Sequence, residues 1–137
     1  MLVVTSPLMA EGIADPDVRR LVTRRYGEIC NGETYDYDRH GQLIVVEPGD
    51  TTKALEQESG CRILRSLFDD ARFGDPEFAP SFEVLEEHPG CYEMVFILND
   101  DGFGVDFFIP KQAGIDPELL AMCAFYAVPA PQQLSLI

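Results

Sequence analysis

The strongest hydrophobic pattern of the chain lies between Cys91 and Pro110, CYEMVFILNDDGFGVDFFIP. Two runs rich in aromatic and branched side chains, 91–98 and 103–109, flank the turn-forming segment 99–102, which predicts a β-hairpin. A turn of two residues would place Asp100 opposite Phe103, whereas a turn of four would place Leu98 there. Both registers leave the same side chains on each face, because they differ by two positions.

One face of this hairpin is wholly apolar and the other is mixed. We expect the apolar face to lie on the core, where each fully buried large side chain contributes roughly 1.5–3 kcal/mol. It carries Tyr92, Met94, Phe96, Leu98, Phe103, Val105, Phe107 and Ile109. The mixed face could be solvated, covered by a helix of the chain, or covered by a partner. Its candidate partner-binding residues are Glu93, Val95, Ile97, Asp106 and Phe108.

Signals for helix starts precede three further apolar patterns. Asp15-Pro16 and Asp116-Pro117 each place an N-cap residue before a proline, and they predict helices over 16–29 and 116–127. In the first helix Val18, Leu21, Val22, Arg25 and Ile29 follow at helical spacing. A cap within 50–52 predicts a third helix over 51–59, which ends before Gly60.

Strand signals extend beyond the hairpin. A continuous apolar run within 42–47 predicts a buried strand, and 81–87 adds a third strand to an antiparallel meander over 81–109. Residues 1–13 resemble an arm or edge strand, and 129–137 a loose tail. We therefore expect one globular α+β domain over 1–137, with an ordered core at about 14–128. Its mostly antiparallel sheet would be packed by about three helices.

Residues 61–68 fit either a helix or a strand. Ile63, Leu64, Leu67 and Phe68 follow at helical spacing. In contrast, 55–80 and 85–110 share Leu-Glu, Gly-Cys and Phe-Gly at a constant offset of thirty positions. A true duplication would favour a strand over 61–68.

Composition places the chain among globular proteins. Its 137 residues suit one domain, with 46% hydrophobic and 25% charged residues. No apolar run approaches the roughly 18 residues that a membrane span requires. The N-terminus lacks the basic lead of a secretory signal, so we expect a cytoplasmic protein. No CxxC pair occurs among Cys30, Cys61, Cys91 and Cys123, which favours reduced, buried thiols.

The net charge of −14 argues against general nucleic-acid binding. From Gly74 onward Lys111 is the only cation, whereas four of the ten cations of the chain fall within 19–25. This basic segment could pack near the protein's own acidic half. Alternatively, the uneven charge could dock a partner or a second copy.

Two groups of polar side chains are candidates for chemistry. Asp36, Asp38 and His40 alternate in YDYDRHG, so an extended segment would point them the same way, and with His88 they could hold a divalent metal. Glu93 and Asp106 are diagonal neighbours on adjacent strands, roughly 7–8 Å apart, within the range of inverting carboxylate pairs. A solvated turn and a solvated sheet face account for the same residues without any chemistry.

Two classes of function remain from the sequence. The leading hypothesis is an acidic, non-enzymatic interaction protein: an adaptor, regulator or inhibitor that binds a basic partner surface or associates with itself. It needs no cofactor and no membrane. The alternative is a small metal-binding protein or metal-assisted hydrolase that uses the Asp36/Asp38/His40 loop. No P-loop, dinucleotide-binding, nucleophile-elbow or HExxH motif is present.

Overall fold

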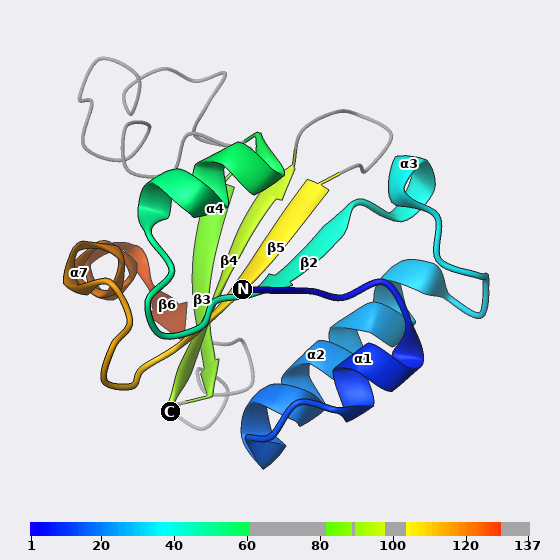
Figure 1. The fold of residues 1–137 in the computed structure, drawn as a ribbon, viewed down its shortest axis with the longest axis horizontal. Helices are drawn as coiled ribbons and strands as arrows, with labels where there is room; N and C mark the ends of the chain where they lie inside the picture. The colour runs from blue at the N-terminus through cyan, green and yellow to red at the C-terminus, as the bar shows by residue number, and fades with distance from the viewer. Residues whose placement is uncertain (61–81, 89, 98–103, 130–137) are drawn as a thin grey trace.

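The computed structural model describes residues 1–60, 82–88, 90–97 and 104–129 (Figure 1). Within these ranges the chain forms an α+β structure of five helices and one six-stranded sheet. The elements in order are β1 (Leu2–Val3), α1 (Pro7–Glu11), α2 (Pro16–Cys30), α3 (Tyr37–His40), β2 (Gln42–Val45), α4 (Thr52–Ser59), β3 (Phe82–His88), β4 (Cys91–Ile97), β5 (Gly104–Pro110), α7 (Pro117–Tyr126) and β6 (Val128–Pro129).

The sheet has the order β1-β2-β5-β4-β3-β6 and is mixed. The meander expected over 81–109 is present, since β3 pairs with β4 and β4 with β5, both antiparallel. β1 also joins β2 antiparallel, whereas β2 joins β5 in parallel and β6 joins β3 in parallel, so the sheet is mixed, with three antiparallel strand pairs and two parallel ones among the described residues. Hydrophobic runs reveal a strand but not the direction of its neighbour, although the continuous run of β2 suits a parallel strand buried on both faces.

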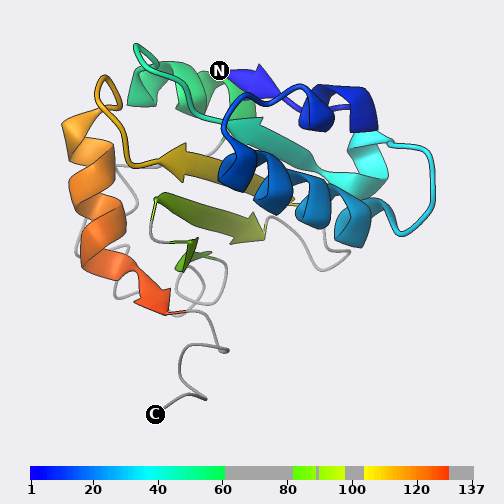
Figure 2. The same ribbon diagram turned by 90° about the horizontal axis from the view of Figure 1, so that it is seen from below.

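Helices cover both faces of the sheet (Figures 1 and 2). On one face α4 and α7 pack on the apolar side chains of the hairpin, in a cluster that includes Leu55, Met94, Phe107, Leu119 and Met122. On the other face α1 and α2 pack on β2, β4 and β5, in a cluster that includes Val18, Val22, Leu43, Val45 and Phe108. The sheet is therefore the middle of three layers.

The hairpin register follows the longer of the two expected turns. Cys91 lies opposite Pro110 and Ile97 opposite Gly104, which is the register expected for a turn of four residues. The turn itself, 98–103, lies outside the described residues. Tyr92, Met94 and Phe96 are buried with Val105, Phe107 and Ile109, as the apolar face predicts.

The three expected helices form with the expected caps. The Asp15 side chain accepts hydrogen bonds from the backbone N–H groups of Asp17 and Val18, and α2 ends at Asn31 in the left-handed conformation. Thr51 caps α4 by accepting from Ala54 N–H, which decides between the cap candidates. Asp116 caps α7 by accepting from Glu118 N–H.

The N-terminal segment is more ordered than an arm. Leu2–Val3 is an edge strand, as one of the two expectations has it, and it is followed by the short helix α1, capped by Ser6. The question of helix or strand at 61–68, most of the possible duplication and residues 130–137 of the expected tail lie outside the described residues. Among the helices that the structure describes, none has the length and apolar character that a membrane crossing requires.

Candidate functional site: a carboxylate pair beneath a helix

Two carboxylates lie side by side on the sheet face that α2 covers. Glu93 of β4 pairs with Phe108, and Asp106 of β5 pairs with Val95, which makes the two acids diagonal neighbours on one face. They are almost completely buried, with 5% and 3% of their surface exposed. The diagonal placement that the sequence suggests is thus present, but within the interior and not on a solvated face.

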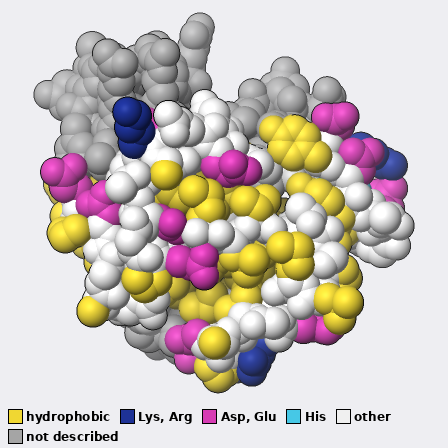
Figure 3. All heavy atoms as spheres, viewed as in Figure 1, with side chains coloured by type: hydrophobic (Ala, Val, Ile, Leu, Met, Phe, Trp, Pro, Cys, Tyr) yellow, Lys and Arg dark blue, Asp and Glu magenta, His cyan; other side chains and the backbone are white. Residues whose placement is uncertain are grey.

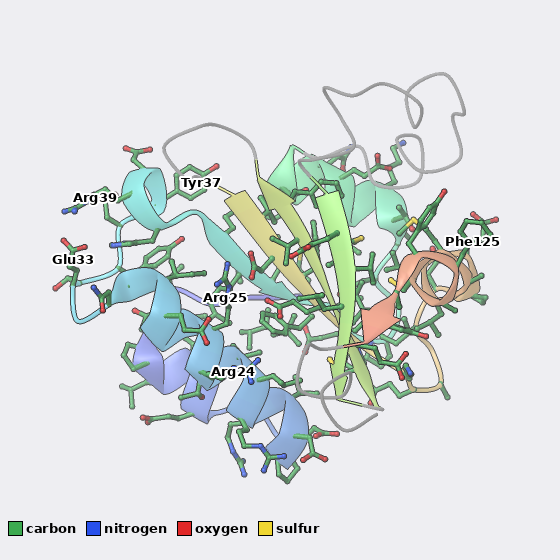
Figure 4. All side chains as sticks on the ribbon, turned by 180° about the vertical axis from the view of Figure 1, so that it is seen from behind. Arg24, Arg25, Glu33, Tyr37, Arg39 and Phe125 are labelled. Carbon is green, nitrogen blue, oxygen red and sulfur yellow. The ribbon has the colours of Figure 1, made fainter. Side chains whose placement is uncertain are left out.

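Arg25 of α2 is the cation that meets this pair. Its Nε donates a hydrogen bond to Asp106 Oδ2 at 2.7 Å and lies 3.7 Å from Glu93 Oε2. Its Nη1 lies 3.3 Å from Glu28 Oε2 on the next turn of the helix. Figure 4 shows Arg25 reaching from α2 toward the strands, and Arg24 at the preceding position of the same helix. The guanidinium of Arg25 therefore forms ion pairs with three carboxyl groups.

The local sequence of α2 explains how Arg25 arrives there. Val18, Leu21 and Val22 are buried against the sheet, and Arg25 follows at the next position of the same stripe. A charged residue in an apolar stripe is seldom left unpaired, because an unpaired buried charge is costly. This interruption was the one signal in the sequence that could have connected α2 to the acids of β4 and β5.

The surroundings shift the proton affinity of the pair. The pKa of Glu93 is raised to about 8. Burial is the largest cause, and a hydrogen bond to Asp106 and the charge of Asp106 add to it, while Arg25 and Arg24 oppose the rise. Burial acts to lower the pKa of Arg25. The acids around it, Asp106, Glu93 and Glu28, together raise this pKa by more, so the net shift is upward. The site therefore favours a protonated Glu93 beside a charged Arg25.

This arrangement does not match a hydrolytic carboxylate pair. An inverting pair keeps its carboxyl groups roughly 6.5–9.5 Å apart so that a water molecule fits between them. Glu93 and Asp106 instead both contact one guanidinium nitrogen, since Arg25 Nε lies 2.7 Å from Asp106 Oδ2 and 3.7 Å from Glu93 Oε2. What the geometry can do is bind α2 to the sheet and hold or release a proton.

The five residues expected to bind a partner are mostly covered by this helix layer. Glu93 and Asp106 meet Arg25, and Phe108 is buried in the cluster that α2 forms on the sheet. Val95 is partly exposed, and the side chain of Ile97 lies outside the described residues. The sequence left open whether this face is solvated, covered by a helix of the chain, or covered by a partner. In the structure α2 covers it. A partner or second copy could contact all of these side chains only if α2 moved away.

The backbone of His88 lies away from the loop that carries the other three residues expected to bind a metal, Asp36, Asp38 and His40. Asp36 caps α3, where its side chain accepts from Asp38 N–H, and His40 Nδ1 accepts from Asp36 N–H. His40 lies two positions before Gln42, which pairs with Val105, whereas His88 pairs with Cys91, which lies opposite Pro110. The five-residue rise along β5 separates these ends by roughly 17 Å. Among the described residues no three His, Cys, Asp or Glu side chains are grouped so that they could hold a metal ion.

The environment of His40 also differs from that of a solvated turn. Its ring is buried, lies beside Tyr35, and places Nε2 3.6 Å from Glu33 Oε1. Tyr35 in turn stacks on Tyr26 of α2 and donates a hydrogen bond to the carbonyl of Gly41. These contacts tie α3 to the end of α2.

Comparison with known protein families, with curated proteins and with solved structures finds no match to this chain.

Proposed function

We propose that the protein is an acidic, non-enzymatic interaction protein, an adaptor, regulator or inhibitor whose partner presents a basic surface. The observation that carries this proposal is how its charges are distributed. The chain has 24 Asp and Glu against 10 Lys and Arg, and most cations of the described residues are engaged by the protein's own acids. The exposed surface therefore keeps an excess of negative charge.

The internal pairs account for most cations that the structure describes. Their N···O distances lie between 2.6 and 3.5 Å. The pairs are Arg20–Asp17, Arg24–Glu28, Arg25–Asp106, Arg39–Glu33 and Lys111–Glu86. In addition, Arg19 donates to the carbonyl of Ile13. Arg25 brings the basic segment onto the acidic half of the chain, so this segment is mainly used within the molecule.

Exposed carboxylates remain on both helix layers. Figure 3 shows them spread over the face seen in Figure 1, interleaved with apolar side chains and with few Lys or Arg. Glu58 of α4 and Glu118 of α7 are exposed on one side of the sheet, and Glu11 of α1 and Glu83 of β3 are exposed elsewhere. A field of one sign steers a basic partner toward the surface and speeds association, and salt weakens the effect.

Affinity capture from an extract of the native host tests the proposal. The tagged protein is incubated with extract at 50 mM and at 500 mM NaCl, and each retained protein is then purified and titrated against it directly. We expect a basic protein that is retained at the lower salt concentration, and whose dissociation constant rises at least tenfold at the higher one. Retention of no basic protein, or binding insensitive to salt, would contradict the proposal.

Two matched variants distinguish a specific surface from bulk charge. Glu58→Lys/Glu118→Lys changes the α4 and α7 side, and Glu11→Lys/Glu83→Lys changes exposed positions elsewhere by the same net charge. We expect one variant to weaken binding to the purified partner at least tenfold more than the other. Equal weakening by both would reduce the interaction to nonspecific attraction and would count against a dedicated partner surface.

A further inference from the structure

The carboxylate pair beneath α2 has more negative charge than its surroundings neutralise. Glu93 and Asp106 are both buried, and the guanidinium of Arg25 that faces them is also engaged by Glu28. If both acids were ionised, two buried negative charges would share one cation. A buried charge without a full partner is strongly unfavourable, so such a site takes up a proton.

The other groups around the pair do not supply the missing charge. The charges that act on Glu93 are those of Asp106, Arg25 and Arg24, and the elements packed there also carry Glu28 of α2, its cap residue Asp15, Glu83 of β3 and Cys91 of β4. Arg24 pairs with Glu28 at 3.5 Å, and burial raises the pKa of the Cys91 thiol to about 12, which keeps it neutral. The described residues of β2 on this face are Leu43 and Val45, which are apolar.

We propose that Glu93 and Asp106 keep one proton between them when α2 is docked, and that loss of this proton weakens the attachment of α2 to the sheet. The distances place the proton on Glu93, because Arg25 Nε is 2.7 Å from Asp106 and 3.7 Å from Glu93. The protonated Glu93 donates to the Asp106 carboxylate, which in turn accepts from Arg25. The arrangement is a proton-dependent latch on α2.

The direction of the pH dependence follows from the pKa of Glu93. In the unfolded chain this carboxyl ionises near its ordinary value of 4.5, and in the folded protein burial raises its pKa to about 8. Between these two values the folded protein holds one more proton than the unfolded chain, so its stability falls as pH rises. The stabilisation is fully present below about pH 4.5 and is lost as pH rises through about 8. Between these values the equilibrium constant for unfolding rises by up to about tenfold for each pH unit.

Glu93→Gln isolates this dependence. The amide of Gln donates to Asp106 as the protonated carboxyl does, but it cannot ionise. Urea unfolding of the wild type and of Glu93→Gln is followed from pH 5 to pH 9, with Glu83→Gln as a control that removes one exposed carboxylate near the pair. We expect the unfolding constant of the wild type to rise relative to that of Glu93→Gln by at least tenfold across this range. Glu83→Gln should follow the wild type.

Parallel pH profiles of the wild type and Glu93→Gln would overturn the proposal. If Glu93→Gln does not fold, the carboxyl carbon of Glu93 in the wild type decides by nuclear magnetic resonance. We expect it to titrate above pH 7, and titration near pH 4.5 would overturn the proposal.

Hydrogen exchange measures the attachment of α2 directly. Above pH 8, the amides of α2 should exchange faster in the wild type than in Glu93→Gln, and at pH 6 they should exchange equally fast in both. Equal exchange at both pH values would exclude the latch.

Discussion

At the scale of single residues, Arg25 decides the character of the buried site. Its guanidinium compensates Asp106 directly and leaves Glu93 to be neutralised by a proton. Removing one partner of a buried ion pair destabilises a protein far more than replacing the whole pair with apolar residues. The reason is that the remaining charge then stays in the interior without compensation. The residue is one-third exposed, which moderates this cost.

Arg25→Gln should lower the free energy of unfolding by about 2 kcal/mol at pH 7, because Asp106 then remains buried without its cation. Urea denaturation monitored by circular dichroism measures the change. Arg20→Gln is the matched control, since Arg20 pairs with Asp17 on the exposed side of the same helix. It should change stability by less than about 0.5 kcal/mol. A loss in Arg25→Gln no larger than that of its control would contradict the role given to Arg25.

A second residue-scale constraint lies at Gly41, between α3 and β2. Its φ of 76° is in the left-handed region, and a β-carbon there would collide with the backbone of Gly104 at the start of β5. Gly41→Ala should therefore destabilise the protein by more than about 1 kcal/mol. Gly27→Ala is the control, because a β-carbon at Gly27 on α2 meets nothing within 4 Å. That change should be neutral or stabilising, and both are measured by thermal unfolding.

At the scale of elements, the caps predict the helices well and the stripes predict them less well. All three Asp-Pro or Thr caps act as expected, because capping is a contact between residues two or three positions apart. Apolar residues at helical spacing predict that α7 faces the core with Leu119, Leu120, Cys123, Ala124 and Ala127. In the structure Met122 is buried and Ala124 is exposed, so the buried side differs from the predicted one. This helix is apolar on most sides, so periodicity alone does not fix which side faces the sheet.

Asp116 joins two elements as well as capping one. Its Oδ1 accepts from Glu118 N–H, and its Oδ2 accepts a hydrogen bond from the Thr52 hydroxyl of α4 at 2.9 Å. Asp116→Ala should cost about 1–2 kcal/mol, because it removes a cap and a link between α4 and α7. Asp116→Asn keeps an oxygen acceptor and should cost less than half as much. Equal losses in the two variants, measured by urea denaturation, would show that the hydrogen bonds are not the cause.

At the scale of the whole molecule, the net charge of −14 acts against the compact state. The ion pairs described above use most cations of the described residues, and exposed carboxylates remain at the surface. The surface carboxylates that would attract a basic partner therefore also repel one another. Salt screens this repulsion over about 10 Å at 0.1 M.

We expect the melting temperature at pH 7 to rise by a few degrees between 20 mM and 500 mM NaCl, because screening relieves the self-repulsion. Differential scanning calorimetry measures the shift. The variant Glu58→Lys/Glu118→Lys, whose net charge is four units less negative, should show a smaller rise. A melting temperature that falls with salt would mean that the internal ion pairs outweigh the surface repulsion.

The sequence by itself determined the local structure of this protein. Asp15, Thr51 and Asp116 start helices, and alternation over 91–98 and 103–109 sorts the hairpin into an apolar and a mixed face. Each of these features depends on residues close in the chain, so the residue pattern is sufficient to predict it.

The tertiary structure alone decided what covers the mixed face and how β2 joins the sheet. Arg25 and Asp106 are 81 positions apart, and β2 pairs in parallel with a strand some sixty residues farther along the chain. Hydrophobic patterns show which side chains are buried but not which distant segment covers them. That choice turned two apparent surface acids, Glu93 and Asp106, into a buried pair that shares Arg25, because complementary charge and packing act between segments that only the fold brings together.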